Sequence, residues 1–292
     1  MLAAMPENEE IKRAQIEVCL LIAGPMFHLG FPEDSLEILQ TGELHSKEVD
    51  DKKSLTLFLS LIGQYYAWKG GDLRQAIQYS ENSFNEAEKI NDIDLMAPIG
   101  ADLSFLYFWM GDYFKVNYVA SKVIVMLEKM KLRAEFFGRP YNVYSFLLAQ
   151  HSTCSWRMGN FEEGKALFDK GLEFALKIKD LFSLGLLEGH HGWDFNFKGD
   201  ARPAIEHLQK SIEYCEEGQI VNLQVPLLFG LGLAYWLSGK LDVARDYVEK
   251  GIKAQIESGV PHDIGFFYGS SGMVFLDSGD LNKARQLAEE KA

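Results

Sequence analysis

The sequence is poor in the features that mark secreted, membrane-spanning or nucleic-acid-binding proteins. Its three cysteines, Cys19, Cys154 and Cys215, follow no disulfide spacing, which is typical of a reducing compartment. No apolar run reaches the roughly 18 residues that a membrane span needs. The acidic start MLAAMPENEEIKRAQ lacks the basic and apolar regions of a signal peptide. The 42 acidic residues outnumber the 29 basic ones, so the chain has little positive charge to neutralise the phosphates of a nucleic acid. We therefore expect a cytoplasmic protein that binds neither nucleic acid nor membrane.

Strand-like alternation is also missing, and a glycine-centred turn signal such as GDYF, GNFE or GDLN recurs instead. The step between successive turn glycines is 41, 40, 48, 40, 40 and 40 residues. Such a regular period indicates stacked structural repeats. The turn glycines are Gly30, Gly71, Gly111, Gly159, Gly199, Gly239 and Gly279.

Residue types around each turn glycine also agree between repeats. The fifth residue after the glycine is mostly small, and the fourth before it is mostly large, so two helices can approach closely with a large side chain between them. Segments such as ARDYVEKGIKAQIE carry apolar residues at helical spacing. Each repeat is predicted to be a helix A, a turn and a helix B. The repeats span about 8–48, 51–91, 92–130, 131–180, 181–219, 220–259 and 260–292, in one all-α domain over residues 1–292.

These columns resemble the tetratricopeptide repeat, which implies a right-handed α-solenoid of about seven helical hairpins. The common period is about 34 residues, so a step near 40 predicts longer helices. LRAEFFGRPYNVYSFLLAQHSTCSWRMGNFEEG and VPLLFGLGLAYWLSGKLDVARDYVEKGI are also similar to the C-terminal repeat regions of bacterial multidomain regulators. Those regulators carry a nucleotide cyclase or similar domain and a P-loop ATPase domain before the repeats. Since the sequence stops inside a helix B, at LNKARQLAEEKA, we expect a fragment of a longer protein.

One stretch, GNFEEGKA at 159–166, comes close to the phosphate-binding pattern G-x-x-x-x-G-K-[ST]. A phosphate loop must follow a strand and present its backbone N–H groups. Here Gly159 is a turn glycine, Gly164 takes the small position of helix B, and Ala166 has no hydroxyl for Mg²⁺. The stretch is therefore predicted to be a repeat turn, with no nucleotide chemistry.

The candidate binding surface is the inner face of the helices A, where all five tryptophans fall. Large aromatic side chains are common anchors of binding surfaces, and a strip of them suggests a groove for an apolar helix or an extended segment. Burial of these rings against one another, or against missing domains of the same protein, is the alternative. The predicted partner-binding residues are Trp68, Phe105, Trp109, Trp156, Arg157, Trp193, Asn196, Phe197, Leu233 and Trp236.

The longer step between Gly111 and Gly159 comes from an insert, KMKLRAEFFGRPY at 129–141. Phe136 and Phe137 stand beside the helix breakers Gly138 and Pro140, so the insert is either a contact loop or a structural connection on the solenoid.

A polar group on two adjacent helices A is a candidate chemical site by its residue types. His151 and His191 share one column, Cys154 and Asp194 the next, and His190 lies alongside. Their spacing matches no metal motif, and Cys154 has no evident oxyanion donors for nucleophilic chemistry. We predict interior polar residues, and neither metal, cofactor nor catalytic residues.

The sequence thus predicts a non-catalytic scaffold that binds a protein or peptide and serves as the sensory repeat region of a signalling protein. A sensor for a small apolar ligand and a structural spacer or dimerisation module are the alternatives. A closed pocket would favour the sensor, and a groove filled by its own side chains would favour the spacer.

Overall fold

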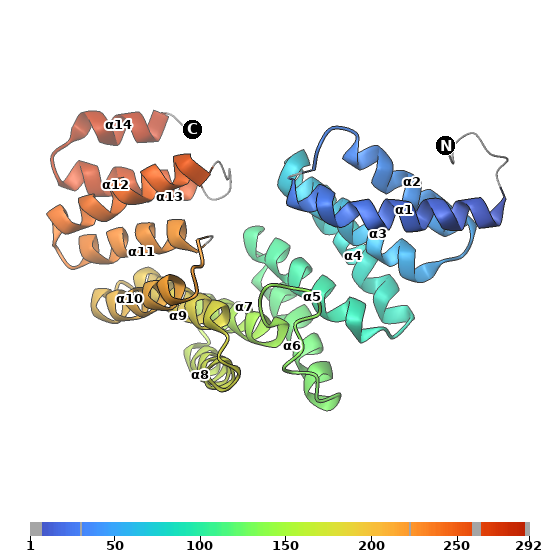
Figure 1. Ribbon diagram of the computed structural model, residues 1–292. Coiled ribbons are helices and arrows are strands. Elements are labelled where there is room, and N and C mark those ends of the chain that lie inside the picture. Colours follow the sequence, from blue (N-terminus) through green and yellow to red (C-terminus); the bar gives the residue numbers. More distant parts are fainter. Residues whose placement is uncertain (1–7, 30, 222, 259–263, 290–292) are drawn as a thin grey trace. The chain divides into compact units, whose positions relative to one another are not determined.

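The computed structural model describes residues 8–29, 31–221, 223–258 and 264–289, and every regular element in these ranges is a helix. The chain divides into two compact units, Met1–Arg139 (unit 1) and Pro140–Ala292 (unit 2). In both units, helices A and B alternate as antiparallel hairpins (Figure 1). The predicted helical hairpins are therefore confirmed, whereas their union in a single domain stays a prediction.

The helices divide between the two units. Unit 1 contains α1 (Glu9–His28), α2 (Ser35–Glu48), α3 (Lys52–Tyr65), the π-helical turn η2 (Tyr66–Gly70), α4 (Leu73–Lys89), α5 (Ile93–Trp109) and α6 (Tyr113–Lys129). Unit 2 contains α7 (Val143–Arg157), α8 (Phe161–Ile178), α9 (Leu181–Lys198), α10 (Ala201–Glu217), α11 (Gln224–Leu237), α12 (Leu241–Ser258), α13 (Ile264–Asp277) and α14 (Leu281–Glu289).

Backbone conformation explains the recurring glycines. Gly111, Gly159 and Gly199 have φ values of 74°, 86° and 80°, and a Cβ added at any of them would meet nothing within 4 Å. These turns therefore require glycine for its left-handed backbone conformation, which other residues adopt only at an energetic cost. In some repeats the aspartate after the glycine caps the next helix: Asp112 accepts a hydrogen bond from the Lys115 N–H at 3.2 Å, and Asp72 accepts one from the Gln75 N–H at 3.0 Å. Gly30 lies outside the described residues.

The second repeat has one extra residue at its turn, and a π-helical turn accommodates it. Helix α3 continues into η2, whose wider hydrogen-bonding pattern includes Gly70 before the left-handed Gly71 (φ 67°). The N–H of Asp72 closes the turn on the carbonyl of Tyr66 at 3.1 Å. A single inserted residue inside a helix typically produces such a bulge.

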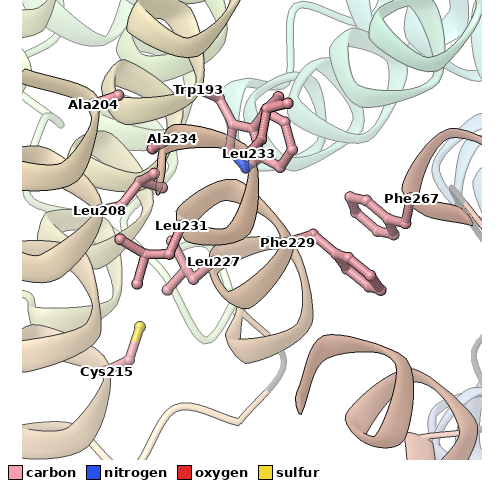
Figure 2. Packing of buried hydrophobic residues seen from close by; sticks show 10 residues of the cluster. All are labelled: Trp193, Ala204, Leu208, Cys215, Leu227, Phe229, Leu231, Leu233, Ala234 and Phe267. Atoms are coloured by element: carbon pink, nitrogen blue, oxygen red, sulfur yellow. The ribbon is translucent and has the colours of Figure 1, made fainter. Parts of the chain in front are cut away.

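Small residues in the helices A make room for leucines of the helices B. Leu208 of α10 is fully buried, and a Cβ added at Gly192 of α9 or Gly230 of α11 would come within 2.6 or 3.0 Å of its side chain. Leu208 and Leu231 belong to the core between α10 and α11 (Figure 2). Truncation of such a leucine to alanine typically costs about 2–5 kcal/mol of stability.

The core of unit 2 extends from α11 to α13. The rings of Phe229 and Phe267 stack with centroids 4.5 Å apart and planes at 8° (Figure 2). The cysteines Cys19, Cys154 and Cys215 are all buried free thiols. Burial raises the pKa of Cys154 to about 12 and that of Cys215 to about 11, so both thiols are protonated at neutral pH.

Candidate functional site

The predicted binding residues of unit 2 divide into buried and exposed groups. Trp156, Trp193 and Leu233 are 8–9% exposed, and Asn196 is also buried. Arg157 and Trp236 are half-buried, and Phe197 is 52% exposed. A partner could therefore contact only the exposed members of the predicted set, and the buried members support them.

Trp156 is held by its own repeat and by the next helix A. Its ring meets Phe161, His191 and Phe195 edge-on, with centroids 5.1–5.2 Å apart. The indole also covers Gly164, where an added Cβ would lie 2.1 Å from Trp156 Cδ1. These contacts make Trp156 part of the packing between α7, α8 and α9.

Trp193 forms the floor of an exposed aromatic patch. Its Nε1–H donates to the carbonyl of Pro226 at 3.1 Å, which ties α9 to α11. Phe197 and Phe266 flank the indole at 5.8 and 5.5 Å and lie 6.0 Å from each other. The guanidinium of Arg157 stands 4.8 Å from the Phe197 ring centroid. We call these four residues the unit 2 patch.

A buried polar cluster lies beside this patch, between α7 and α9. Thr153 Oγ1 donates to Asp194 Oδ2 at 3.2 Å and lies 3.4 Å from His190 Nδ1. Desolvation raises the pKa of Asp194 to about 8, against the opposing pull of Arg157. Desolvation, assisted by Arg157, lowers the pKa of His190 to about 4. At neutral pH, His190 is neutral and Asp194 is largely protonated.

Two further polar contacts connect successive helices A. Asn196 Nδ2 donates to the carbonyl of Gly230 at 2.9 Å, and Trp236 Nε1 donates to Asp277 Oδ2 at 2.7 Å. In each case the polar group of a predicted binding residue donates its hydrogen bond to the neighbouring helix. Asn196 and Trp236 therefore hold the spacing of the helices that carry the patch.

In unit 1 the predicted strip comes from η2 and α5. Trp68 is exposed, and its ring meets Trp109 edge-on at 5.6 Å. Phe105 is 4.3 Å from Trp109, one helical turn away. The structure brings these three rings together, and we call them the unit 1 strip.

The insert forms a connection without a helix between α6 and α7. Phe136 is partly exposed and Phe137 is half-buried, with Phe137 in a left-handed conformation at φ 50°. Arg139 forms an ion pair with Asp102 of α5, and Gln64 Nε2 donates to the same Asp102 oxygen at 2.9 Å. The insert is thus anchored on α5 of unit 1.

The structure also places Gly164 and the polar residues of the helices A. Gly164 lies inside α8, and its N–H donates to the carbonyl of Asn160 at 2.9 Å, so it cannot serve a phosphate. Among the described residues, no three histidine, cysteine or acidic side chains gather as a metal site. His191 stacks on Phe168 at 4.1 Å, and burial lowers its pKa to about 3.

Sequence reasoning missed Phe266 and the pairing of Asp102 with Arg139. Phe266 begins the only Phe-Phe pair in the last repeat, in the column of Pro226 thirteen residues before the turn glycine. The Phe266 ring lies against Trp193, a contact that the position of Phe266 near the start of its helix does not indicate. Nothing in the local sequence of α5 indicates that an arginine 37 positions later contacts it.

Two hollows of the described surface lie away from both aromatic areas. One, of about 460 Å³, lies between α12 and α14 and includes Ile252 and Ile256. The other, of about 230 Å³, is lined by α4, α5 and α6 and includes Glu81 and Lys122. Neither is lined by a predicted binding residue. No helix in the described ranges is long and apolar enough to cross a membrane.

Comparison with known proteins identifies the fold. The sequence profile of the tetratricopeptide repeat matches residues 225–255, which cover most of α11 and α12. No curated protein matches the sequence. The apo form of RapI superposes with a TM-score of 0.70 at 13% identity, over 88% of this chain and 88% of that one.

Two other solved structures extend this comparison. A Rap protein complexed with competence and sporulation factor gives a TM-score of 0.67 at 16% identity, over 96% of this chain and 86% of that one. A signal transduction ATPase with numerous domains, from Pyrococcus horikoshii, has a tetratricopeptide repeat sensor. It gives a TM-score of 0.63 at 17% identity, over 97% of this chain and 42% of that one. At these identities the likeness shows the fold alone, an all-α tetratricopeptide solenoid, and function has to be argued from the site.

Proposed function

We propose that this tetratricopeptide solenoid binds a segment of a protein partner on the unit 2 patch. The observation that carries the proposal is that Phe197 and Phe266, 52% and 46% exposed, stand side by side over Trp193. Aromatic side chains that sit partly exposed on a rigid floor are typical anchors of protein interfaces.

The patch also specifies the chemistry of the segment. An apolar side chain on the partner would cover the two phenylalanine rings. Arg157, which lies over Phe197, would meet an acidic side chain or a main-chain carbonyl. The hydrogen bonds of Trp193 and Asn196 to α11 keep this surface in place before binding, so little ordering entropy is lost.

The wider role is part of the same proposal. One similar structure is a Rap protein complexed with competence and sporulation factor, and another is a signal transduction ATPase with numerous domains that has a tetratricopeptide repeat sensor. We propose a cytoplasmic, regulatory repeat region of a larger signalling protein, in which partner binding biases the other domains. Contacts with those domains, and pairing of two copies of the chain, are further ways in which the exposed rings could be covered.

Selection from a random peptide library tests the proposal. Peptides that bind the protein would be remeasured against a Phe197→Ala, Phe266→Ala double variant. Truncation of an interface anchor typically costs 2 kcal/mol or more, so we expect binding to weaken at least about 30-fold. The matched control is Phe114→Ala, because Phe114 is an 80% exposed phenylalanine on α6 of unit 1.

Both variants remove exposed rings, so urea unfolding should show stabilities close to that of the parent chain. Selected peptides that bind the double variant as tightly as the parent would refute the unit 2 patch as the site. Light scattering would reveal whether two copies cover the patch, in which case the double variant, and not the control, becomes monomeric.

A further inference from the structure

Asp102 stands in line with the aromatic residues of the unit 1 strip. On α5, Asp102, Phe105 and Trp109 follow one another at i, i+3 and i+7, so they share one face of the helix. Gln64 and Trp68, four residues apart on α3 and η2, lie opposite. Gln64 Nε2 contacts Asp102 Oδ2 at 2.9 Å, and Trp68 contacts Trp109 at 5.6 Å. A carboxylate thus ends a row of aromatic rings.

The cation on this carboxylate comes from the insert. Arg139 Nη2 donates to Asp102 Oδ2. The Arg139 N–H closes a turn on the carbonyl of Phe136 at 2.9 Å, and the central residues Phe137 and Gly138 have φ values of 50° and 72°. Positive φ at both positions defines a type I′ turn, which is costly for a bulky residue such as Phe137. The backbone of the insert is therefore strained where it presents Arg139.

The match between Arg139 and its site is incomplete. Only one guanidinium nitrogen bonds to Asp102, whereas arginine and carboxylate commonly pair through two. Arg139 Nε is buried and has no hydrogen-bond partner among the described residues. Burial raises the pKa of Asp102 although Arg139 opposes the shift, so a cation beside this carboxyl group favours its ionised form.

We propose that Asp102, Gln64 and the rings of the unit 1 strip form a recognition site for an arginine side chain of a partner segment. In the chain by itself, Arg139 of the insert occupies this site. A planar guanidinium suits it because that group can pair with a carboxylate and stack on aromatic rings together. An arginine free of the strained turn makes the second hydrogen bond that Arg139 lacks, and it displaces the insert. The inference rests on the proposed function, since it names the chemistry of a partner segment on unit 1.

The insert itself supplies the probe. A fluorescent peptide of residues 132–141, LRAEFFGRPY, would be titrated into the full chain, the Arg139→Gln variant and the Arg139→Gln, Asp102→Asn double variant. The matched control is Arg133→Gln, which removes another charge from the same insert. A second peptide would carry citrulline, the neutral isostere of arginine, in place of Arg139.

We expect the Arg139→Gln variant to bind the peptide at least about tenfold more tightly than the parent chain or the control. Hydrogen bonds to charged groups contribute enough for a 10- to 100-fold effect. The citrulline peptide and the double variant should each lose a similar factor. The Phe197→Ala, Phe266→Ala variant should bind the peptide as the parent does. If Arg139→Gln unfolds the chain, Arg139→Lys provides a weaker occupant, and a smaller gain is expected.

Two results would overturn the inference. If the Arg139→Gln variant binds the arginine and citrulline peptides equally, the site does not recognise guanidinium, although peptide binding as such still stands. If no variant binds the insert peptide while library peptides bind the unit 2 patch, the unit 1 site is refuted and the proposed function is not. Failure of both assays would refute both.

Discussion

Gly164 offers a sharp test of the packing described for unit 2. The equivalent position is alanine in four other repeats, namely Ala76, Ala204, Ala244 and Ala284. Repeat comparison and helix propensity alone would therefore predict that Gly164→Ala stabilises α8, by about 1 kcal/mol.

The structure predicts the opposite sign. An added Cβ would lie 2.1 Å from Cδ1 and 2.8 Å from Nε1 of Trp156, whose buried indole already contacts the rings of Phe161, His191 and Phe195. Overpacking of a buried site typically costs about 1–3 kcal/mol, which outweighs the propensity gain. We expect Gly164→Ala to lower the free energy of unfolding by about 1–2 kcal/mol.

Urea unfolding followed by circular dichroism would measure the effect. The matched control is Gly269→Ala, because Gly269 lies inside α13 and a Cβ there meets nothing within 4 Å. This control should gain up to about 1 kcal/mol from helix propensity. In a Trp156→Ala background the cost of Gly164→Ala should disappear, which gives a coupling of about 1–3 kcal/mol. The reasoning is refuted if Gly164→Ala stabilises the chain as Gly269→Ala does.

Three further perturbations test the turn, the polar cluster and the core. Gly199→Ala should destabilise the chain by about 1–2 kcal/mol in urea unfolding, because its φ of 80° is left-handed, and an unchanged midpoint would contradict this. The pKa of Asp194 in the folded chain, about 8, exceeds the ordinary value of 3.8 for aspartate, so its contribution to stability falls as pH rises from about 4 to 8. Asp194→Asn should flatten that fall in the urea midpoint, and parallel pH profiles would rule out the assignment. Leu208→Ala should cost about 2–5 kcal/mol, and a loss below 1 kcal/mol would show that the α10–α11 core is loosely packed.

The sequence by itself determined the hairpins, because their signals are local. A turn glycine such as Gly199 is needed for its own φ, and an aspartate such as Asp112 caps the helix that follows it. The period and the assignment of GNFEEGKA to a repeat turn both follow from such short-range constraints. The same logic identified the faces that carry the aromatic residues.

Only the tertiary structure decided which of these aromatic residues reach the surface. Trp193 and Phe197 are neighbours on one face of α9, yet α11 and α13 cover the first and leave half of the second exposed. Trp156 could cover Gly164 only because their two helices cross there. The contact of Arg139 with Asp102 likewise depends on the path of the insert across α5. Whether a side chain is buried or paired depends on the residues that contact it, and many of these lie far away in the sequence.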